Sequence, residues 1–180
     1  MKLWAKGGEL NKDIESFTVG DDYIFDRRLV RHDCAASLAH AKALCKAGLL
    51  TAKELANITA GLKAIMALDA RGKFVIKMED EDCHTAIENW LTARYGEAGK
   101  KVHTGRSRND QVLTALRLYE REALTELKAR LAAFSAAAAV LAKKQGRLPM
   151  PGYTHTRRAM PTTVGIWIGC FAAAAADDSR

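Results

Sequence analysis

The spacing of hydrophobic residues predicts a chain built mainly from α-helices. Over residues 110–144, apolar side chains recur at alternating intervals of three and four residues, which is the spacing of a helix-bundle seam. At 1.5 Å per residue, a helix of this length would span about 50 Å. The rest of the chain offers few helices of comparable length, so we expect this one to pack against helices from other chains.

Shorter helices are expected on either side of this long one. Residues 25–44 form one candidate, and a second begins after Thr51, whose hydroxyl can form a capping box with Glu54. The acidic run at 79–82 favours the start of a third helix, and residues 162–176 resume a helical pattern. No run alternates in polarity for long enough to suggest a sheet, so the predicted fold class is mainly α.

Composition and charge narrow the functional classes. The chain has 180 residues, 48% hydrophobic, which suffices for a folded core, and a formal net charge of +7. The basic residues are interleaved with acids rather than pooled in a tail, which favours solvated helix faces and one anion pocket over nucleic-acid binding.

The N-terminal residues and the apolar runs bear on location. The first eight residues show no apolar run behind a basic start, so no secretory signal is expected. The longest apolar stretch, residues 164–176, is too short to span a bilayer. We therefore expect a cytoplasmic protein without membrane contact.

The cysteines predict neither a metal site nor disulfides. The four are scattered without a C-x-x-C spacing or matching histidine pairs, and free, mostly buried thiols are the expected state. They are Cys34, Cys45, Cys83 and Cys170.

The segment His103–Val112, HTGRSRNDQV, concentrates polar chemistry where the long helix begins. Ser107 or Asn109 could cap that helix, and unpaired amides together with Arg106 and Arg108 would suit a carboxylate or phosphate. From these residues alone, two interpretations stay open: a capped, salt-bridged helix start, or a ligand site.

A second polar cluster is Thr154-His155, within the segment MPGYTH. Histidine exchanges protons near neutral pH, but a single loop histidine is more often a surface residue. For His84, which follows the acidic run, a structural contact with a carboxylate is expected, and for Ser37, which lies among alanines, close packing.

Four segments together resemble a known family. FDRRLVRHDCAASLAHAKALCKAGLL, EDEDCHTAIENWL, HTGRSRNDQV and MPGYTH followed by RAMP are similar, in order and spacing, to the N-terminal half of the argininosuccinate lyases and their delta crystallin relatives. The resemblance covers most of the chain. HTGRSRNDQV and PGYTH are the specific segments, whereas the first would be weak alone.

The resemblance implies a fold and a reaction. Members of this fumarase/aspartase superfamily are homotetramers built around long-helix bundles, with each active site drawn from three subunits. The implied division of this chain is an N-terminal helical domain at 1–109 and a first part of the central helix-bundle domain at 110–180. The implied reaction is a β-elimination that splits argininosuccinate into arginine and fumarate without a metal or organic cofactor. A base removes a proton beside a carboxylate and an acid protonates the departing nitrogen.

The family's functional residues map onto matching positions of this chain. The resemblance makes Ser37, Asn109 and Thr154 substrate ligands, with Arg108 a neighbouring candidate. His155 is the implied proton-transfer residue, either as the base itself or by assisting another group.

This chain differs from the pattern of the family in its length and at two positions. Family members run more than twice as far and carry a later serine loop that has no counterpart here, so the chain is expected to be an incomplete, inactive portion. Arg157 adds a charge beside the implied histidine, and Ala36 stands where a glycine is commoner. The alternative is a catalytically silent structural protein of the delta crystallin type.

Overall fold

The computed structural model describes residues 11–179, so the expectation for residues 1–8 lies outside the described residues. Contacts between Cα atoms divide the chain into two compact units, the first ending at Glu120 and the second beginning at Arg121. Each unit is described by itself. No helix among the described residues is long and apolar enough to cross a membrane.

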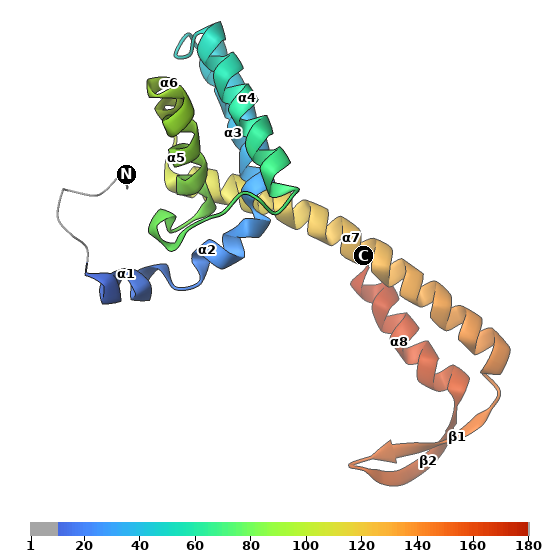
Figure 1. The fold of residues 1–180 in the computed structure, drawn as a ribbon. Coiled ribbons are helices and arrows are strands. Elements are labelled where there is room, and N and C mark those ends of the chain that lie inside the picture. The colour runs from blue at the N-terminus through green and yellow to red at the C-terminus, as the bar shows by residue number, and fades with distance from the viewer. Residues whose placement is uncertain (1–10, 180) are drawn as a thin grey trace. The chain divides into compact units, whose positions relative to one another are not determined.

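Over its described residues, 11–120, the first unit forms only helices as regular structure. Its elements, shown in Figure 1, are α1 (Lys12–Val19), α2 (Asp22–Phe25), η1 (Asp26–Arg28), α3 (Val30–Lys46), α4 (Ala52–Asp69), η2 (Met78–Asp80), α5 (Cys83–Tyr95), α6 (Glu97–Lys100), η3 (Lys101–His103) and the beginning of α7 (Arg108–Gln145).

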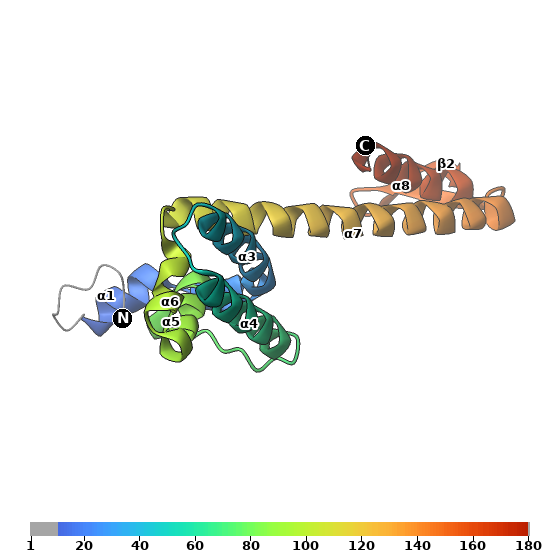
Figure 2. The ribbon, with the colours of Figure 1, turned by 90° about the horizontal axis from the view of Figure 1, so that it is seen from above.

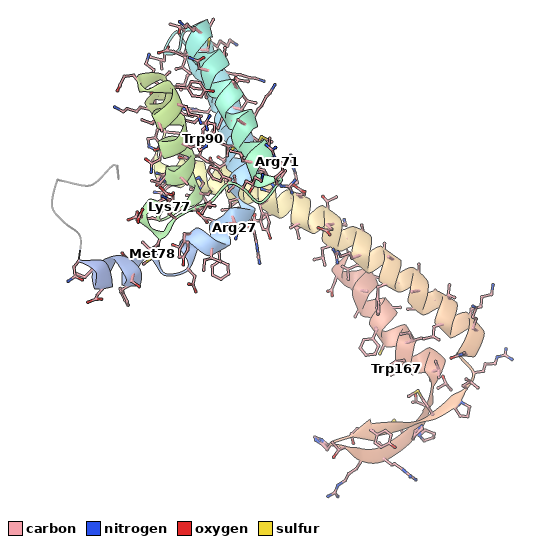
Figure 3. The ribbon with its side chains drawn as sticks, in the orientation of Figure 1. Arg27, Arg71, Lys77, Met78, Trp90 and Trp167 are labelled. Atoms are coloured by element: carbon pink, nitrogen blue, oxygen red, sulfur yellow. The ribbon has the colours of Figure 1, made fainter. Side chains whose placement is uncertain are left out.

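The core of the first unit lies where α3, α4 and α5 pack together (Figures 1 and 2). Its largest fully buried apolar side chains are Ile58, Leu62, Ile65, Ile87 and Leu91. Burying each of these stabilises the fold by roughly 1.5–3 kcal/mol relative to exposure. On one edge of the core, the Arg94 guanidinium lies 4.1 Å above the ring of Trp90, which Figure 3 labels on α5.

Two predicted helix starts are confirmed by their caps. Glu54 N–H donates to Thr51 Oγ1 at 3.2 Å and Thr51 N–H donates to Glu54 Oε2 at 2.8 Å, which completes the capping box of α4. At the start of α5, Asp82 accepts from the N–H of Thr85 at 2.6 Å. Both caps are local in sequence.

The first predicted helix begins later than residue 25. The chain forms the 3-10 turn η1 at Asp26–Arg28, and the regular helix α3 starts at Val30 and continues to Lys46. A long-range contact explains the break: the carboxylate of Asp26 accepts from the N–H of Cys83 at 3.1 Å. In an uninterrupted helix, the position of Asp26 would be set by the helix and not by its hydrogen bond with Cys83.

The second unit holds the rest of α7, a hairpin and α8. The hairpin, β1 (Pro149–Thr154) and β2 (Arg157–Thr163), is antiparallel, with a register shift between Pro151 and Tyr153. The sequence predicted a loop over these residues, and that prediction was wrong for this one element. The rest of the chain is mainly α, as expected. In α8 (Val164–Asp178), Thr163 caps the helix.

Apolar residues remain exposed along α7 and α8. On α7 these are Leu113, Leu124, Leu127, Phe134 and Val140, and on α8 they are Ile166, Trp167 and Phe171. The last two stack edge to face with ring centroids 5.8 Å apart, and Figure 3 labels Trp167.

Candidate active site

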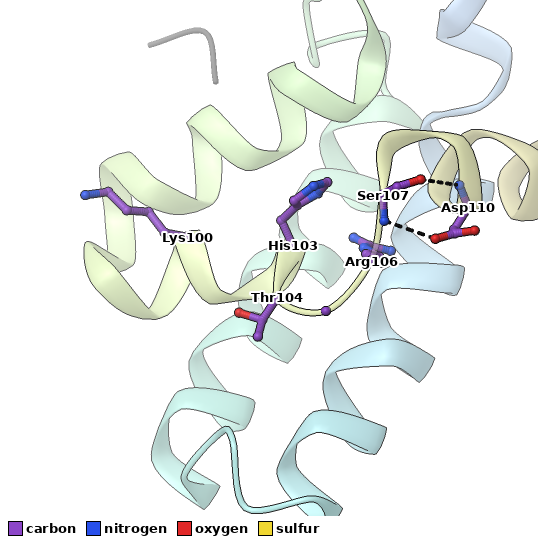
Figure 4. A pocket seen from close by; sticks show the side chains of 7 residues that line it. Lys100, His103, Thr104, Arg106, Ser107 and Asp110 are labelled. Atoms are coloured by element: carbon purple, nitrogen blue, oxygen red, sulfur yellow. Dashed lines mark hydrogen bonds between the residues drawn. The ribbon is translucent and has the colours of Figure 1, made fainter. Parts of the chain in front are cut away.

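The segment His103–Val112 carries the chain from η3 into α7. Ser107 N–H donates to Asp110 Oδ2 at 3.0 Å, and Asp110 N–H donates to Ser107 Oγ at 3.4 Å (Figure 4). Of the two candidate caps, the structure therefore selects Ser107, and Asn109 lies within the exposed first turn of α7. Gly105 supplies the turn before it with a φ of 73°, which a side chain would disfavour.

An open pocket of about 580 Å³ lies over this segment. Figure 4 shows the side chains that line it: Lys100, His103, Thr104, Arg106, Ser107 and Asp110, together with Gly105. Lys100, which also pairs with Glu97, and Arg106 outnumber the carboxylate of Asp110 in this lining, and the pocket lies beside the start of a long helix. These features favour an anionic ligand.

Contacts from other helices hold the loop that forms this pocket. His40 Nε2 of α3 lies 2.8 Å from the carbonyl oxygen of Thr104, and since a carbonyl only accepts, this nitrogen carries the proton. His103 Nδ1 lies 3.0 Å from Glu88 Oε1 of α5, within ion-pair distance. Two packed helices therefore fix the loop.

Ser37 lies at the centre of a buried polar contact. Its hydroxyl accepts from Arg106 Nη2 at 2.9 Å and donates to Asp33 Oδ1 at 3.3 Å. Asp33 and Ser37 are one helical turn apart on α3, and both are fully buried. Ser37 is thus more than a small packing residue, because it joins α3 to the loop before α7.

The Asp33 carboxylate connects three helices. Gln111 Nε2 donates to both of its oxygens, at 3.1 and 3.0 Å, from α7. His84 Nδ1 of α5 lies 3.2 Å from Asp33 Oδ2, within ion-pair distance but outside hydrogen-bond geometry. The carboxylate contact expected for His84 is thus present as an ion-pair distance.

Arg108 turns its guanidinium toward α5 and the first turn of α7. Its Nη1 donates to Gln111 Oε1 at 3.2 Å and its Nη2 donates to Thr85 Oγ1 at 3.1 Å. Asp82 and Glu88 each lie 3.8 Å from it. The structure therefore places Arg108 beside Ser37's network but with much of its hydrogen-bonding capacity used within the protein.

Burial shifts the pKa of several groups in this unit. Burial lowers the pKa of the Arg106 guanidinium, while the nearby Asp33 and Glu88 carboxylates oppose that shift. Burial also raises the pKa of the Cys34 and Cys83 thiols, and neighbouring carboxylates add to the effect. Arg106 remains charged at neutral pH because an arginine starts from so high a value.

Thr154 and His155 lie in the second unit, at the end of β1 and in the turn of the hairpin. His155 and Thr156 both have positive φ angles, 49° and 61°, and form the two-residue turn between the paired Thr154 and Arg157. This is the backbone of a type I′ turn, which usually takes asparagine or glycine. A histidine held in that conformation is strained, and such strain is concentrated at functional sites.

The structure thus groups Ser37, Arg108 and Asn109 around the start of α7, and places Thr154 and His155 together in the hairpin. Sequence reasoning missed Asp33 and Gln111. The interval of four residues between Asp33 and Ser37 could have signalled a shared helix face. Nothing local could have signalled Gln111, which is 78 residues from Asp33.

Comparison with known proteins gives the family. A family model described as Lyase matches residues 12–180. The argininosuccinate lyase of Thermotoga neapolitana is 48% identical over 179 residues, which is 99% of this chain and 45% of that protein. The argininosuccinate lyase of Sorangium cellulosum is 45% identical over 98% of this chain and 41% of its own. The chain therefore spans less than half the length of these relatives.

Solved structures confirm the fold. A fumarate lyase:delta crystallin from Brucella melitensis covers 92% of this chain, with a TM-score of 0.71 and 22% identity, and 43% of that chain is matched. The β-carboxy-cis,cis-muconate cycloisomerase of Acinetobacter calcoaceticus covers 93% of this chain and 39% of its own, with a TM-score of 0.63 and 21% identity. The chain therefore belongs to the Lyase family matched over residues 12–180, and its fold is that of the fumarase/aspartase superfamily.

Proposed function

We propose that this chain is part of an enzyme that cleaves argininosuccinate into arginine and fumarate by β-elimination, in arginine biosynthesis. The observation that carries the proposal is the 48% identity to an argininosuccinate lyase across 99% of the chain. The cationic pocket before α7 supports it, because the substrate carries several carboxylates.

We propose distinct roles for the two polar clusters. Ser37, Asn109 and Thr154 would bind substrate, and Arg108 is a neighbouring candidate. We add Arg106 because it lines the pocket before α7. His155 would transfer a proton, either as the base or by assisting another group. No metal or organic cofactor is needed in this scheme, because the carbanion beside a carboxylate is stabilised by hydrogen bonds and positive charge.

We further propose that the active enzyme is a cytoplasmic homotetramer. The exposed apolar residues of α7 and α8 support this, since a face carrying Leu124, Leu127 and Phe134 at about half exposure suits helix packing between subunits.

The test is fumarate release from argininosuccinate, followed by the ultraviolet absorbance of fumarate. The 180-residue chain would be assayed alone and together with a C-terminal complement taken from a full-length relative. We expect turnover only in the assembled pair. Correct assembly without turnover would contradict the proposal and would favour a catalytically silent protein of the delta crystallin type.

Variants at the hairpin turn separate chemistry from backbone geometry. Asparagine adopts positive φ readily but cannot act as a base, so His155→Asn should keep the turn and lower kcat by about 10²–10⁴-fold. Thr156→Gly is the matched control, since it relieves the same kind of strain at the neighbouring position and should leave kcat within a few-fold. Equal losses in both variants would show that the turn matters rather than the imidazole.

A further inference from the structure

The strongest unassigned cluster in the described residues joins η1 to the start of α5. A carboxylate oxygen of Asp26, Sγ of Cys83 and a ring nitrogen of His84 all lie within 4.8 Å of one another. Cys83 and His84 are buried and Asp26 is half-buried. Asp26 lies 57 residues before Cys83 in the sequence, so no short spacing of ligand residues predicts this cluster.

His84 carries the second observation. Its side chain is 1% exposed, and neither of its ring nitrogens has a hydrogen-bond partner. A buried polar atom without a hydrogen-bond partner destabilises a packed core, and a bound ion is one arrangement that would satisfy it.

The neighbours of His84 match those of a metal-binding histidine. Metal-ligating histidines commonly present their other ring nitrogen to a carboxylate, which fixes the orientation of the ring. Asp33 Oδ2 lies 3.2 Å from His84 Nδ1, and Gln111 in turn holds that carboxylate with two hydrogen bonds. Because Nδ1 faces the Asp33 carboxylate, Nε2 is the ring nitrogen that remains for a metal ion.

Local charge also favours a cation. Asp26, Asp33 and Asp82 are all within electrostatic reach of Cys83. Two cations face this group, Arg106 near Asp33 and Arg108 at 3.8 Å from Asp82, so the carboxylates outnumber them. A mixed set of thiolate, imidazole and carboxylate donors suits Zn²⁺ better than Mg²⁺ or Ca²⁺, which prefer oxygen alone.

We propose that Asp26, Cys83 and His84 form a binding site for a divalent zinc-like cation that ties η1 to the N-terminus of α5. Binding releases the thiol proton of Cys83 to solvent, and water would complete a tetrahedral set of ligands. The proposed metal site lies among the helices that hold the loop before α7. It is independent of the proposed lyase reaction and can be tested without substrate.

The test titrates Co²⁺, and then Zn²⁺ in competition, into the 180-residue chain. We expect one equivalent of Co²⁺ to give a thiolate-to-cobalt charge-transfer band that Zn²⁺ abolishes. Cys83→Ser should remove the band, and Asp26→Asn should weaken Co²⁺ binding at least about 10-fold, since a ligand matters no less than the groups behind it. Circular dichroism would verify the helical content of each variant.

Two matched controls identify the sulfur. Cys34→Ser removes another buried thiol and Cys170→Ser removes an exposed one, and both should keep the band and the affinity. A chain that gives no charge-transfer band would overturn the proposal. So would a band that survives Cys83→Ser or disappears in Cys170→Ser. Because Asp26→Asn leaves the buried thiol in place, unchanged affinity in that folded variant would also overturn the three-ligand site.

Discussion

Replacing Asp33 tests whether the buried carboxylate organises the first unit. In Asp33→Ala, the Gln111 amide and the Ser37 hydroxyl lose the carboxylate that accepts their hydrogen bonds, and the His84 imidazole loses an ion-pair contact. Each buried group left without a partner costs about 1–3 kcal/mol, and Ser37 retains its bond from Arg106. We therefore expect a loss of roughly 3–5 kcal/mol, the range found when one partner of a buried charged group is removed.

The isosteric change Asp33→Asn should cost less, about 1–3 kcal/mol. One oxygen remains to accept, but the new amide faces the Nε2 of Gln111, so two donors meet. Gln111 could reverse its amide only by giving up the bond that its Oε1 accepts from Arg108 at 3.2 Å. The matched control is Asp21→Asn, an equal change at an exposed aspartate, which should alter stability by less than about 0.5 kcal/mol.

Amide hydrogen exchange, read by mass spectrometry on peptides from α3, α5 and the start of α7, measures these losses within the first unit. Peptides from α8 carry none of the groups that contact Asp33 and serve as the internal reference. Protection in Asp33→Ala within about 0.5 kcal/mol of the original chain would contradict this prediction, because the two donors, Gln111 and Ser37, would then have found other acceptors.

Three further predictions concern packing, pH and thiol reactivity. Gly61→Ala should destabilise the chain by roughly 1–2 kcal/mol in urea titrations, because overpacking against a leucine of α5 outweighs a helix-propensity gain of about 1 kcal/mol; a more stable variant would contradict this. A hydrogen bond from Lys101, aided by the cap, lowers the pKa of Glu54 from 4.5 to about 2. This contribution is complete above pH 4.5 and is lost as the pH falls through 2, so the stability difference from Glu54→Gln should shrink over that window, and a constant difference would exclude the linkage. Iodoacetamide should label exposed Cys170 first and the buried Cys34 and Cys83 last in peptide maps, and the reverse order would contradict the burial described.

Sequence patterns predicted those parts of the fold that are determined locally. The capping box of Thr51 and Glu54 needs only one turn of chain, and the three-four spacing of the long helix repeats over its whole length. The predicted start of α3 was wrong because Asp26 bonds the N–H of Cys83, 57 residues away, and lies outside the regular helix. Non-local hydrogen bonds of this kind cannot be predicted from the residues that neighbour either partner in the sequence.

The hairpin shows a different reason for failure. Two-residue hairpin turns are usually announced by Asn-Gly or Asp-Gly, which reach positive φ at little cost. Here His155 and Thr156 occupy those positions, so the local signal is missing and the segment resembled a loop. The resemblance of MPGYTH to a known family identified His155 as a candidate where turn propensity could not.

The environment of Ser37 bears on how a substrate could reach it. The side chain is 0% exposed, its hydrogen is donated to Asp33, and one lone pair accepts from Arg106, which itself lines the pocket. A hydroxyl has a second lone pair, but no ligand can approach a fully covered atom. Contact between substrate and Ser37 therefore requires the groups that cover it to move, and Arg106, which both bonds the hydroxyl and lines the pocket, is the group that we expect to move. An anionic substrate supplies the reason for that movement, because a carboxylate offers Arg106 a charged, two-point partner in place of a single neutral hydroxyl. If Ser37 binds substrate as proposed, we expect the arrival of substrate and the uncovering of Ser37 to be one event, with Arg106 as the group that couples them.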